Sequence, residues 1–209
     1  MSDRKVMSKV HYDKLAAKYD QHPHATYLAK LSPLIVARAE AWSADSVADV
    51  GCGTGSLMAL LREAGLKVAG VDISSKMIEL ARDRLGEEAD LRVADSESLP
   101  WEDDSFSLVV CVGSFHHYPA PLRALAEMRR VLRSNGYLII ADPTLPIVVR
   151  QLANLFIGLS GEGATKIYSE SELGSMMRVA HFADVEPIDV NSSAIVLGAS
   201  ANKKGFPGA

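Results

Sequence analysis

The chain has 209 residues, 48% of them hydrophobic and 23% charged, and its formal net charge is −4. This length is enough for one well-packed core and leaves little beyond a single domain with a cap. Because the balance is slightly acidic and the basic clusters are short, the composition disfavours nucleic-acid substrates without excluding them.

Signals for targeting, disulfides and metals are weak. The N-terminal sequence MSDRKVMSKV lacks the basic and then apolar pattern of a signal peptide. The most apolar later stretch, residues 145–159, is interrupted by Arg150 and Asn154, so we expect no membrane span. Cys52 and Cys111 are the two cysteines, and no Cys or His spacing suits a metal ion. We therefore expect a cytoplasmic protein without a metal site.

Short apolar strands alternate with helical patterns along the chain, which is typical of a parallel α/β sheet with right-handed crossovers. The predicted helices lie at 27–42, 56–64, 75–85 and 122–132. The predicted strands lie at 46–50, 67–71, 91–94, 106–112 and 136–142, followed by an antiparallel pair at 185–190 and 192–200. Ser134, Asn135 and Gly136 predict a turn, because Asn and Gly tolerate left-handed backbone conformations.

The first predicted strand runs into a glycine-rich turn, VADVGCGTGSL, at residues 47–57. Gly51, Gly53 and Gly55 lack Cβ and tolerate positive φ, so the backbone here can come close to a ligand. Their G-x-G-x-G spacing differs from the G-x-G-x-x-G signature that holds a pyrophosphate on a helix N-terminus. The turn therefore favours a small nucleoside without phosphates.

Acidic residues follow the next two predicted strands. Asp72 comes about 20 residues after the glycine turn, where an acid is placed to accept hydrogen bonds from both ribose hydroxyls. Asp95 follows the strand at 91–94. Because open α/β sheets bind ligands at the carboxyl ends of their strands, the turn and the two carboxylates predict one site.

Four segments resemble the class I S-adenosylmethionine-dependent methyltransferases, more narrowly their UbiE-like, type 11 branch: VADVGCGTG, VDISSKMIELAR, ADSESLPWEDDSFSLVVCVGSFHHY and EMRRVLRSNGYLIIAD. HYDKLAAKYDQH is similar to the YD-x-x-A-x-x-YD segment that often precedes the core in this branch. The resemblance covers residues 12–142. It implies a Rossmann-like, doubly wound α/β fold with a seven-stranded, mainly parallel sheet, an antiparallel C-terminal strand and a helical N-terminal cap. We expect one domain, with residues 1–44 as the cap and 45–209 as the cofactor-binding core.

The resemblance also implies roles for single residues in binding S-adenosylmethionine. Gly51 and Gly53 would meet the methionine part, and Asp49 would help to place its ammonium group. Asp72 would hold the ribose, and Asp95 would accept a hydrogen bond from the adenine amine. The other expected cofactor-binding residues are Tyr19, Cys52, Ser96 and the apolar Ile73, Met77 and Val112.

Two of these residues have a plainer interpretation. Tyr19 either closes over the cofactor or packs a helix onto the core. Cys52 is expected to be a small packing residue within the turn and not a nucleophile.

Methyl transfer from a sulfonium needs mainly in-line positioning and exclusion of water, so a base matters when the acceptor must lose a proton. The candidate bases are His116 and His117, after the strand at 106–112, and Asp142, at the end of the strand at 136–142. For each histidine the alternative is orientation or loop packing. Adjacent histidines diverge, so the pair does not indicate a metal site.

Residues 143–168 interrupt the alternation of strands and helices with an apolar, helical stretch. They predict either a surface helix that covers the sheet or a lid insertion that forms the acceptor pocket. Ser169, with Glu172 three residues later, predicts a capping box at the start of the next helix.

The sequence thus predicts a methyltransferase that uses S-adenosylmethionine and acts on a small-molecule acceptor, with the acceptor atom and the oligomeric state open. Two other classes of protein stay open as well. A nicotinamide-dependent oxidoreductase would share Asp72 but would need the longer glycine spacing. A noncatalytic regulator would bind S-adenosylmethionine without turnover.

Overall fold

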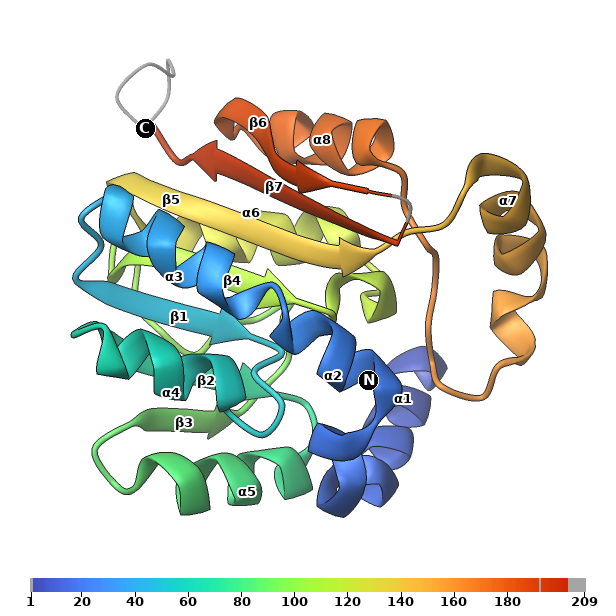
Figure 1. The fold of residues 1–209 in the computed structure, drawn as a ribbon, viewed down its shortest axis with the longest axis horizontal. Helices are drawn as coiled ribbons and strands as arrows, with labels where there is room; N and C mark the ends of the chain where they lie inside the picture. The colour runs from blue at the N-terminus through green and yellow to red at the C-terminus, as the bar shows by residue number, and fades with distance from the viewer. Residues whose placement is uncertain (1, 192, 203–209) are drawn as a thin grey trace.

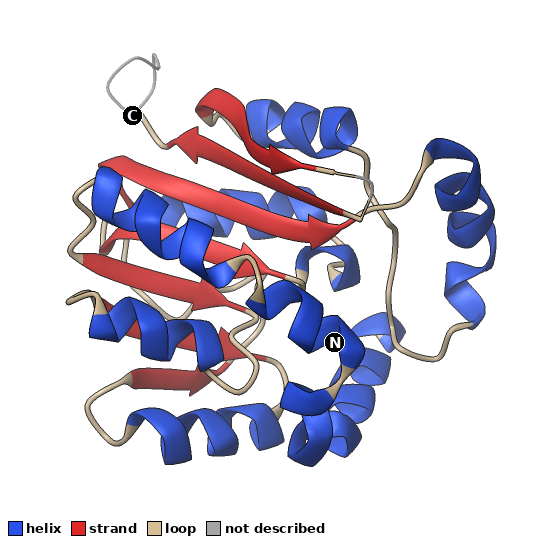
Figure 2. Ribbon diagram, in the orientation of Figure 1, coloured by secondary structure: helices blue, strands red, loops and turns tan. Residues whose placement is uncertain are grey.

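A computed structural model describes residues 2–191 and 193–202 and shows one seven-stranded sheet with helices on both faces (Figures 1 and 2). The strands are β1 (Ser46–Val50), β2 (Lys67–Asp72), β3 (Asp90–Val93), β4 (Phe106–Val112), β5 (Leu132–Pro143), β6 (Ala183–Val190) and β7 (Ala194–Ser200). Their order is β3-β2-β1-β4-β5-β7-β6, in which β7 is antiparallel to both neighbours and the other pairs are parallel. The doubly wound, mainly parallel sheet with an antiparallel C-terminal strand is confirmed.

The helices form two outer layers, and side chains of the strands pack against both. The helices are α1 (Asp3–Leu15), α2 (Pro23–Ala29), α3 (Ser32–Ala41), α4 (Ser56–Glu63), α5 (Ser75–Leu85), α6 (Pro121–Val131), α7 (Ile147–Phe156) and α8 (Glu170–Val179), with 3-10 turns η1 (Ala16–Gln21), η2 (Phe115–His117) and η3 (Ile157–Leu159). In β4, Leu108 and Val110 pack with α3 and α4, whereas Val109 and Cys111 pack with α6 and α8. A central parallel strand is buried on both faces, which explains why FSLVVCV is a nearly continuous apolar run.

One predicted helix is wrong in extent. The single helix expected at 27–42 is two helices, α2 and α3, which are separated at Lys30 and Leu31. Pro33 lies in the first turn of α3. Its ring has no N–H to donate and clashes with a preceding turn of helix, so a new helix begins there instead of an old one continuing.

The turn predicted at 134–136 is also wrong, because β5 runs through these residues. The register between β4 and β5 shifts at this point, and Gly136 is not among the described glycines with positive φ. An added Cβ at Gly136 would lie 3.1 Å from the backbone oxygen of Ser107. It would also lie 2.9 Å from Cδ2 of Leu132 and 3.1 Å from the backbone oxygen of Arg133, both in β5, so close packing and not a positive φ accounts for this glycine.

The capping box predicted for the start of α8 is confirmed. The backbone N–H of Glu172 donates to the Ser169 hydroxyl at 3.2 Å, and the backbone N–H of Ser169 donates to the Glu172 carboxylate at 2.9 Å. This cap satisfies two N–H groups at the helix start and fixes the point where the preceding segment rejoins the core.

Two segments lie beyond the end of the sheet to which β1, β2, β4 and β5 point (Figure 1). α1 and η1 cross this carboxyl edge and contact α5, and α1 also contacts η2. α7 projects further out, and none of its residues is buried. Within the described residues, every helix is too short or too polar to cross a bilayer. The carboxyl edge of the sheet is thus covered by the N-terminal helix, which positions the site.

Candidate functional site

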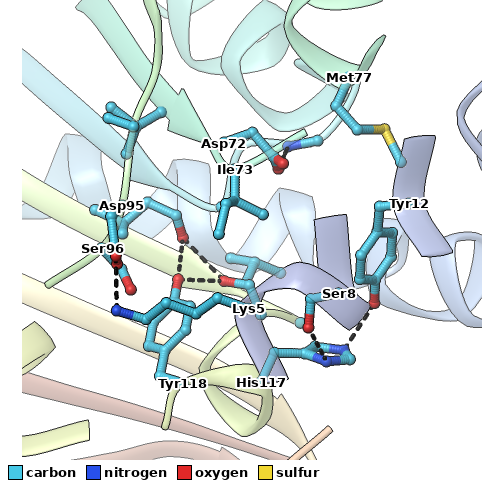
Figure 3. A pocket seen from close by; sticks show the side chains of 18 of the residues that line it. Lys5, Ser8, Tyr12, Asp72, Ile73, Met77, Asp95, Ser96, His117 and Tyr118 are labelled. Carbon is cyan, nitrogen blue, oxygen red and sulfur yellow. Dashed lines mark hydrogen bonds and ion pairs between the residues drawn. The ribbon is translucent and has the colours of Figure 1, made fainter. Parts of the chain in front are cut away.

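A cavity lies between the carboxyl ends of β1, β2 and β4 and the buried face of α1 (Figure 3). Counted together with the solvent space at its open mouth, it measures ≈ 700 Å³. The predicted site residues that line it are Tyr19, Gly51, Gly53, Asp72, Ile73, Met77, Asp95, Ser96, Val112 and His117. Asp49 and Cys52 line a smaller cavity that shares Tyr19, Gly51, Gly53 and Val112 with the first.

The N–H groups of the glycine turn are used within the protein. Gly51 and Cys52 donate to the backbone oxygen of Val71 at 2.8 Å and 2.9 Å. Gly53 donates to Oδ2 of Asp72 at 3.0 Å. A pyrophosphate site needs such N–H groups to point at the ligand. This turn therefore ties β1 to β2 and supports a ligand without phosphates.

Gly51 and Gly53 have different reasons for being glycine, although both have positive φ, +84° and +53°. An added Cβ at Gly51 would lie 2.3 Å from Oγ of Ser114, so Gly51 is required by packing. At Gly53 the nearest atom to such a Cβ is Cε1 of Tyr19, at 3.5 Å. Close approach of a ligand to the backbone is therefore supported at Gly53.

Asp72 ends β2 and is held by two backbone donors. Its Oδ2 accepts from Gly53 at 3.0 Å, and its Oδ1 accepts from Ser74 at 2.8 Å. Burial raises the pKa of Asp72 to about 6, against the lowering effect of these hydrogen bonds. A carboxylate has about four acceptor positions, so Asp72 can still accept from a vicinal diol that enters the cavity.

Asp49 is a buried carboxyl group with an unused oxygen. Its residue is 3% exposed, and within the described chain Oδ1 has no hydrogen-bond partner. Burial, together with the charge of Asp72, raises the pKa of Asp49 to about 7. A buried carboxylate is costly unless a cation or donor compensates it. The smaller cavity therefore suits a ligand that carries an ammonium group.

η1 is fixed over the glycine turn by charged contacts. The Thr54 hydroxyl donates to Asp20 at 2.6 Å, and the Arg84 guanidinium contacts the same carboxylate at 2.5 Å. Tyr19, the preceding residue, lines both cavities and lies against Gly53. This placement favours the interpretation in which Tyr19 faces the cofactor space.

Three polar residues form a chain at the α1 side of the cavity. The Tyr12 hydroxyl lies 2.8 Å from Nε2 of His117, and the Ser8 hydroxyl lies 3.4 Å from Nδ1 of the same ring (Figure 3). Ser8 donates to the backbone oxygen of Glu162 at 3.3 Å. All three contacts can be hydrogen bonds if the Tyr12 hydroxyl donates to Nε2 and the Nδ1–H group donates to Ser8. We assign the tautomer of His117 from this hydrogen-bond network.

His116 and Asp142 are not on the lining of either cavity. Nδ1 of His116 lies 3.0 Å from Oδ1 of Asp142, and both residues are buried. The backbone oxygen of His116 also accepts from the backbone N–H of Thr165 at 2.8 Å. The structure therefore separates His117, on the cavity, from the His116–Asp142 pair behind it.

Sequence reasoning missed Lys5, Ser8 and Tyr118 on the cavity lining and quoted Tyr12 only within a motif. Lys5, Ser8 and Tyr12 are spaced i, i+3 and i+7, which places them on one face of a helix. That spacing was a usable signal. It was hidden because an inward helix face is normally recognised by apolar residues, and these three are polar.

Several known proteins that are similar to this chain are named methyltransferases. Residues 48–140 match a family model described as a methyltransferase domain, that of the type 11 family. Methyltransferase GfsG of Streptomyces halstedii is 35% identical over 147 residues, which are 68% of this chain and 51% of GfsG. Demethylmenaquinone methyltransferase of Clavibacter sepedonicus is 29% identical over 177 residues, 73% of this chain and 71% of that protein.

Other relatives match over a shorter stretch, such as the human protein named "Probable tRNA methyltransferase 9B", 36% identical over 97 residues. Among solved structures, magnesium protoporphyrin IX methyltransferase from Synechocystis PCC 6803, with bound SAH, has a TM-score of 0.73 and 19% identity. The match covers 95% of this chain and 99% of that one. At this identity the likeness shows a shared fold.

Residues 48–140 match a methyltransferase domain, and the chain shares its fold with a methyltransferase that has SAH bound, so S-adenosylmethionine is indicated as the cofactor. The resemblance that the motifs indicated is confirmed at this level: residues 48–140 match the type 11 methyltransferase domain, and a demethylmenaquinone methyltransferase is 29% identical to the chain. The chain spans about half the length of GfsG, the first of these relatives.

Proposed function

We propose that this protein is a methyltransferase that uses S-adenosylmethionine to methylate a small-molecule acceptor. The observation that carries the proposal is the convergence of Asp49, Asp72 and Asp95 on two joined cavities, beside a turn whose N–H groups are already used. Asp49 supplies an unpartnered buried oxygen, which suits an ammonium group.

The residues present fit the three parts of the cofactor. Asp49 and Gly53 would hold the methionine part, Asp72 the ribose, and Asp95 the adenine amine. The side chains of Ser96, Ile73, Met77 and Val112 would border the base, and all four line the larger cavity. S-adenosylmethionine, when bound, supplies an activated methyl group on a sulfonium.

Tyr12 and His117 suit the handling of an acceptor proton. Burial, with the neighbouring His116 and His24, lowers the pKa of His117 well below its usual value, so the ring is neutral at pH 7. With its own proton directed at Nε2, the Tyr12 oxygen can accept a hydrogen bond from an acceptor O–H or N–H. As the acceptor loses that proton on methylation, Tyr12 takes it and passes its own to Nε2. In this proposal His116 and Asp142 position the loop of η2 and do not touch the acceptor.

The segments around the cavity belong to the same proposal. We assign residues 1–44 as a cap and 143–168 as a lid over the acceptor side, within one domain. Support comes from the contacts of the 162–165 stretch, where Arg4 donates to the backbone oxygen of Ala164 at 3.2 Å. A cytoplasmic location is also proposed, in keeping with two free, buried cysteines.

Calorimetric titration of S-adenosylmethionine, S-adenosylhomocysteine and NADH into the full chain tests the cofactor. We expect the first two to bind and NADH not to bind; NADH binding alone would replace the proposal with an oxidoreductase. An acceptor screen that detects S-adenosylhomocysteine then tests the reaction, with small molecules in one arm and tRNA in the other. Turnover with tRNA alone would overturn the small-molecule assignment, and binding without any turnover would favour the noncatalytic regulator.

A further inference from the structure

Among the residues that the structure describes on the lining of the larger cavity, Lys5 of α1 is the one Lys or Arg side chain (Figure 3). Its Nζ lies 2.6 Å from Oδ2 of Asp95 and 2.7 Å from Oε2 of Glu97. The Lys5 side chain is 11% exposed. Burial alone would lower the pKa of Lys5, but hydrogen bonds and charge from the two carboxylates raise it above its ordinary value. Lys5 is therefore an ammonium group at neutral pH.

Asp95 has a partner for each oxygen. Oδ2 is bound by Lys5, and Oδ1 accepts from the backbone N–H of Glu97 at 3.0 Å. Glu97 is anchored independently, because its Oε1 accepts from the backbone N–H of Ala120 at 3.1 Å. Lys5 thus has a second carboxylate that can keep it when Asp95 takes another donor.

The same contacts join α1 to the sheet. Among the ion pairs of α1 in the described part of the chain, those of Lys5 link the helix to the rest of the protein. The other, between Lys9 and Asp13, lies within the helix. A donor that displaces Lys5 from Asp95 therefore removes one of the two ion pairs that fix α1 over the cavity.

We infer that Lys5 is a specificity-determining residue for the nucleobase, because it competes with the 6-amino group of adenine for Asp95. The inference rests on the proposed function, which places adenine at this carboxylate. Because each oxygen of Asp95 already accepts a hydrogen bond, a 6-amino group that approaches Oδ2 competes with Lys5 for that oxygen. A purine with a 6-oxo group instead offers an oxygen to which Lys5 can donate. Lys5 thus weakens binding of amino purines and strengthens binding of oxo purines.

Calorimetry on the full chain with S-adenosylhomocysteine and S-inosylhomocysteine tests this inference. Lys5→Met should bind S-adenosylhomocysteine about fivefold more tightly and S-inosylhomocysteine about fivefold more weakly than the wild type, the effect of one partly exposed ion pair. Lys9→Met is the matched control, since it removes a cation from the same helix but not from the cavity, and it should leave both affinities unchanged.

A second variant covers the case in which Lys5→Met does not fold. Glu97→Gln leaves Lys5 with Asp95 as its remaining carboxylate, so S-adenosylhomocysteine should bind more weakly. A change of the same sign for both ligands in Lys5→Met, or no change, would overturn the inference and assign Lys5 a structural role. If the wild type binds neither ligand, the proposed function itself fails, which separates the two outcomes.

Discussion

The backbone N–H of Gly53 donates to Oδ2 of Asp72 at 3.0 Å, so one carboxylate both closes the turn after β1 and lines the larger cavity. The turn and the acid are 19 residues apart in sequence. Their contact makes ligand binding and turn geometry depend on the same side chain.

Asp72→Asn is expected to weaken S-adenosylhomocysteine binding by about 10- to 100-fold, because a charged acceptor of hydrogen bonds is lost. The amide oxygen can still accept from one backbone N–H, so the variant should fold. Calorimetry gives the affinity, and Asp189→Asn on the edge strand β6 is the control for loss of an acid elsewhere. Unchanged affinity in Asp72→Asn would remove this residue from the site.

Asp49→Asn should separate stability from binding. In the ligand-free protein the buried, unpartnered oxygen is destabilising. The variant should therefore unfold at a higher temperature, and its free energy of unfolding should be larger by about 1 kcal/mol or more. It should also lose most of the thermal stabilisation that S-adenosylhomocysteine gives the wild type. A melt in which Asp49→Asn is less stable and still stabilised fully by ligand would contradict the assigned ammonium contact.

The pKa values of Asp49 and Asp72, raised to about 7 and about 6, predict a pH dependence. Both pKa values lie above that of an aspartate in the unfolded chain, so the folded state holds protons on these two carboxyl groups more tightly than the unfolded state does. The stability that this protonation contributes is fully present below about pH 4. It is lost as the pH rises through 6 and 7. The stability advantage of Asp49→Asn over the wild type should therefore grow between pH 5 and pH 8 in denaturant titrations, and a constant difference would contradict the raised pKa of Asp49.

The two glycines of the turn should respond differently to substitution. Gly51→Ala places a methyl group 2.3 Å from the Ser114 hydroxyl and should cost about 2–3 kcal/mol of unfolding free energy. Gly53→Ala makes an ordinary van der Waals contact with Tyr19 at 3.5 Å, so the cost should be about 1 kcal/mol, from the positive φ, with a larger loss of ligand affinity. Equal losses of stability would refute the packing role of Gly51. Removing the Ser114 hydroxyl with Ser114→Ala should not restore Gly51→Ala, because Cβ of residue 114 would still lie 2.5 Å from the added methyl group.

Tyr12→Phe should reduce kcat by about 100-fold with an acceptor that loses a proton, because proton transfer through a positioned group contributes at least this much. Cofactor affinity should change little, since Tyr12 lies at the α1 side of the cavity beside His117. Steady-state kinetics with the acceptor from the screen measures the effect. His116→Gln, at a residue off the cavity lining, should reduce protein stability more than it reduces kcat. If it reduced kcat more than Tyr12→Phe does, His116 would be the base instead.

Local sequence patterns determined most of the fold. β1 and β4 lie at the residues predicted for them, because each is a short apolar run bounded by polar or turn residues. The errors at Pro33 and at 134–136 arose where a proline or an inter-strand contact overrode a local preference. Neither influence is visible in the period of hydrophobic residues alone.

The sequence by itself determined that the glycine turn and the acids lie together, because the ends of parallel strands occupy one edge of any sheet with this strand order. Tertiary structure alone decided which residues of the N-terminal helix line the cavity with them. It brought Lys5, Ser8 and Tyr12 of α1 beside Asp95 and His117, which lie ninety or more residues away in the chain, and it placed His116 and Asp142 off the cavity lining. Such contacts depend on how the N-terminal helix packs across the sheet edge. The spacing of apolar residues does not reveal that packing, because the inward face of α1 is polar.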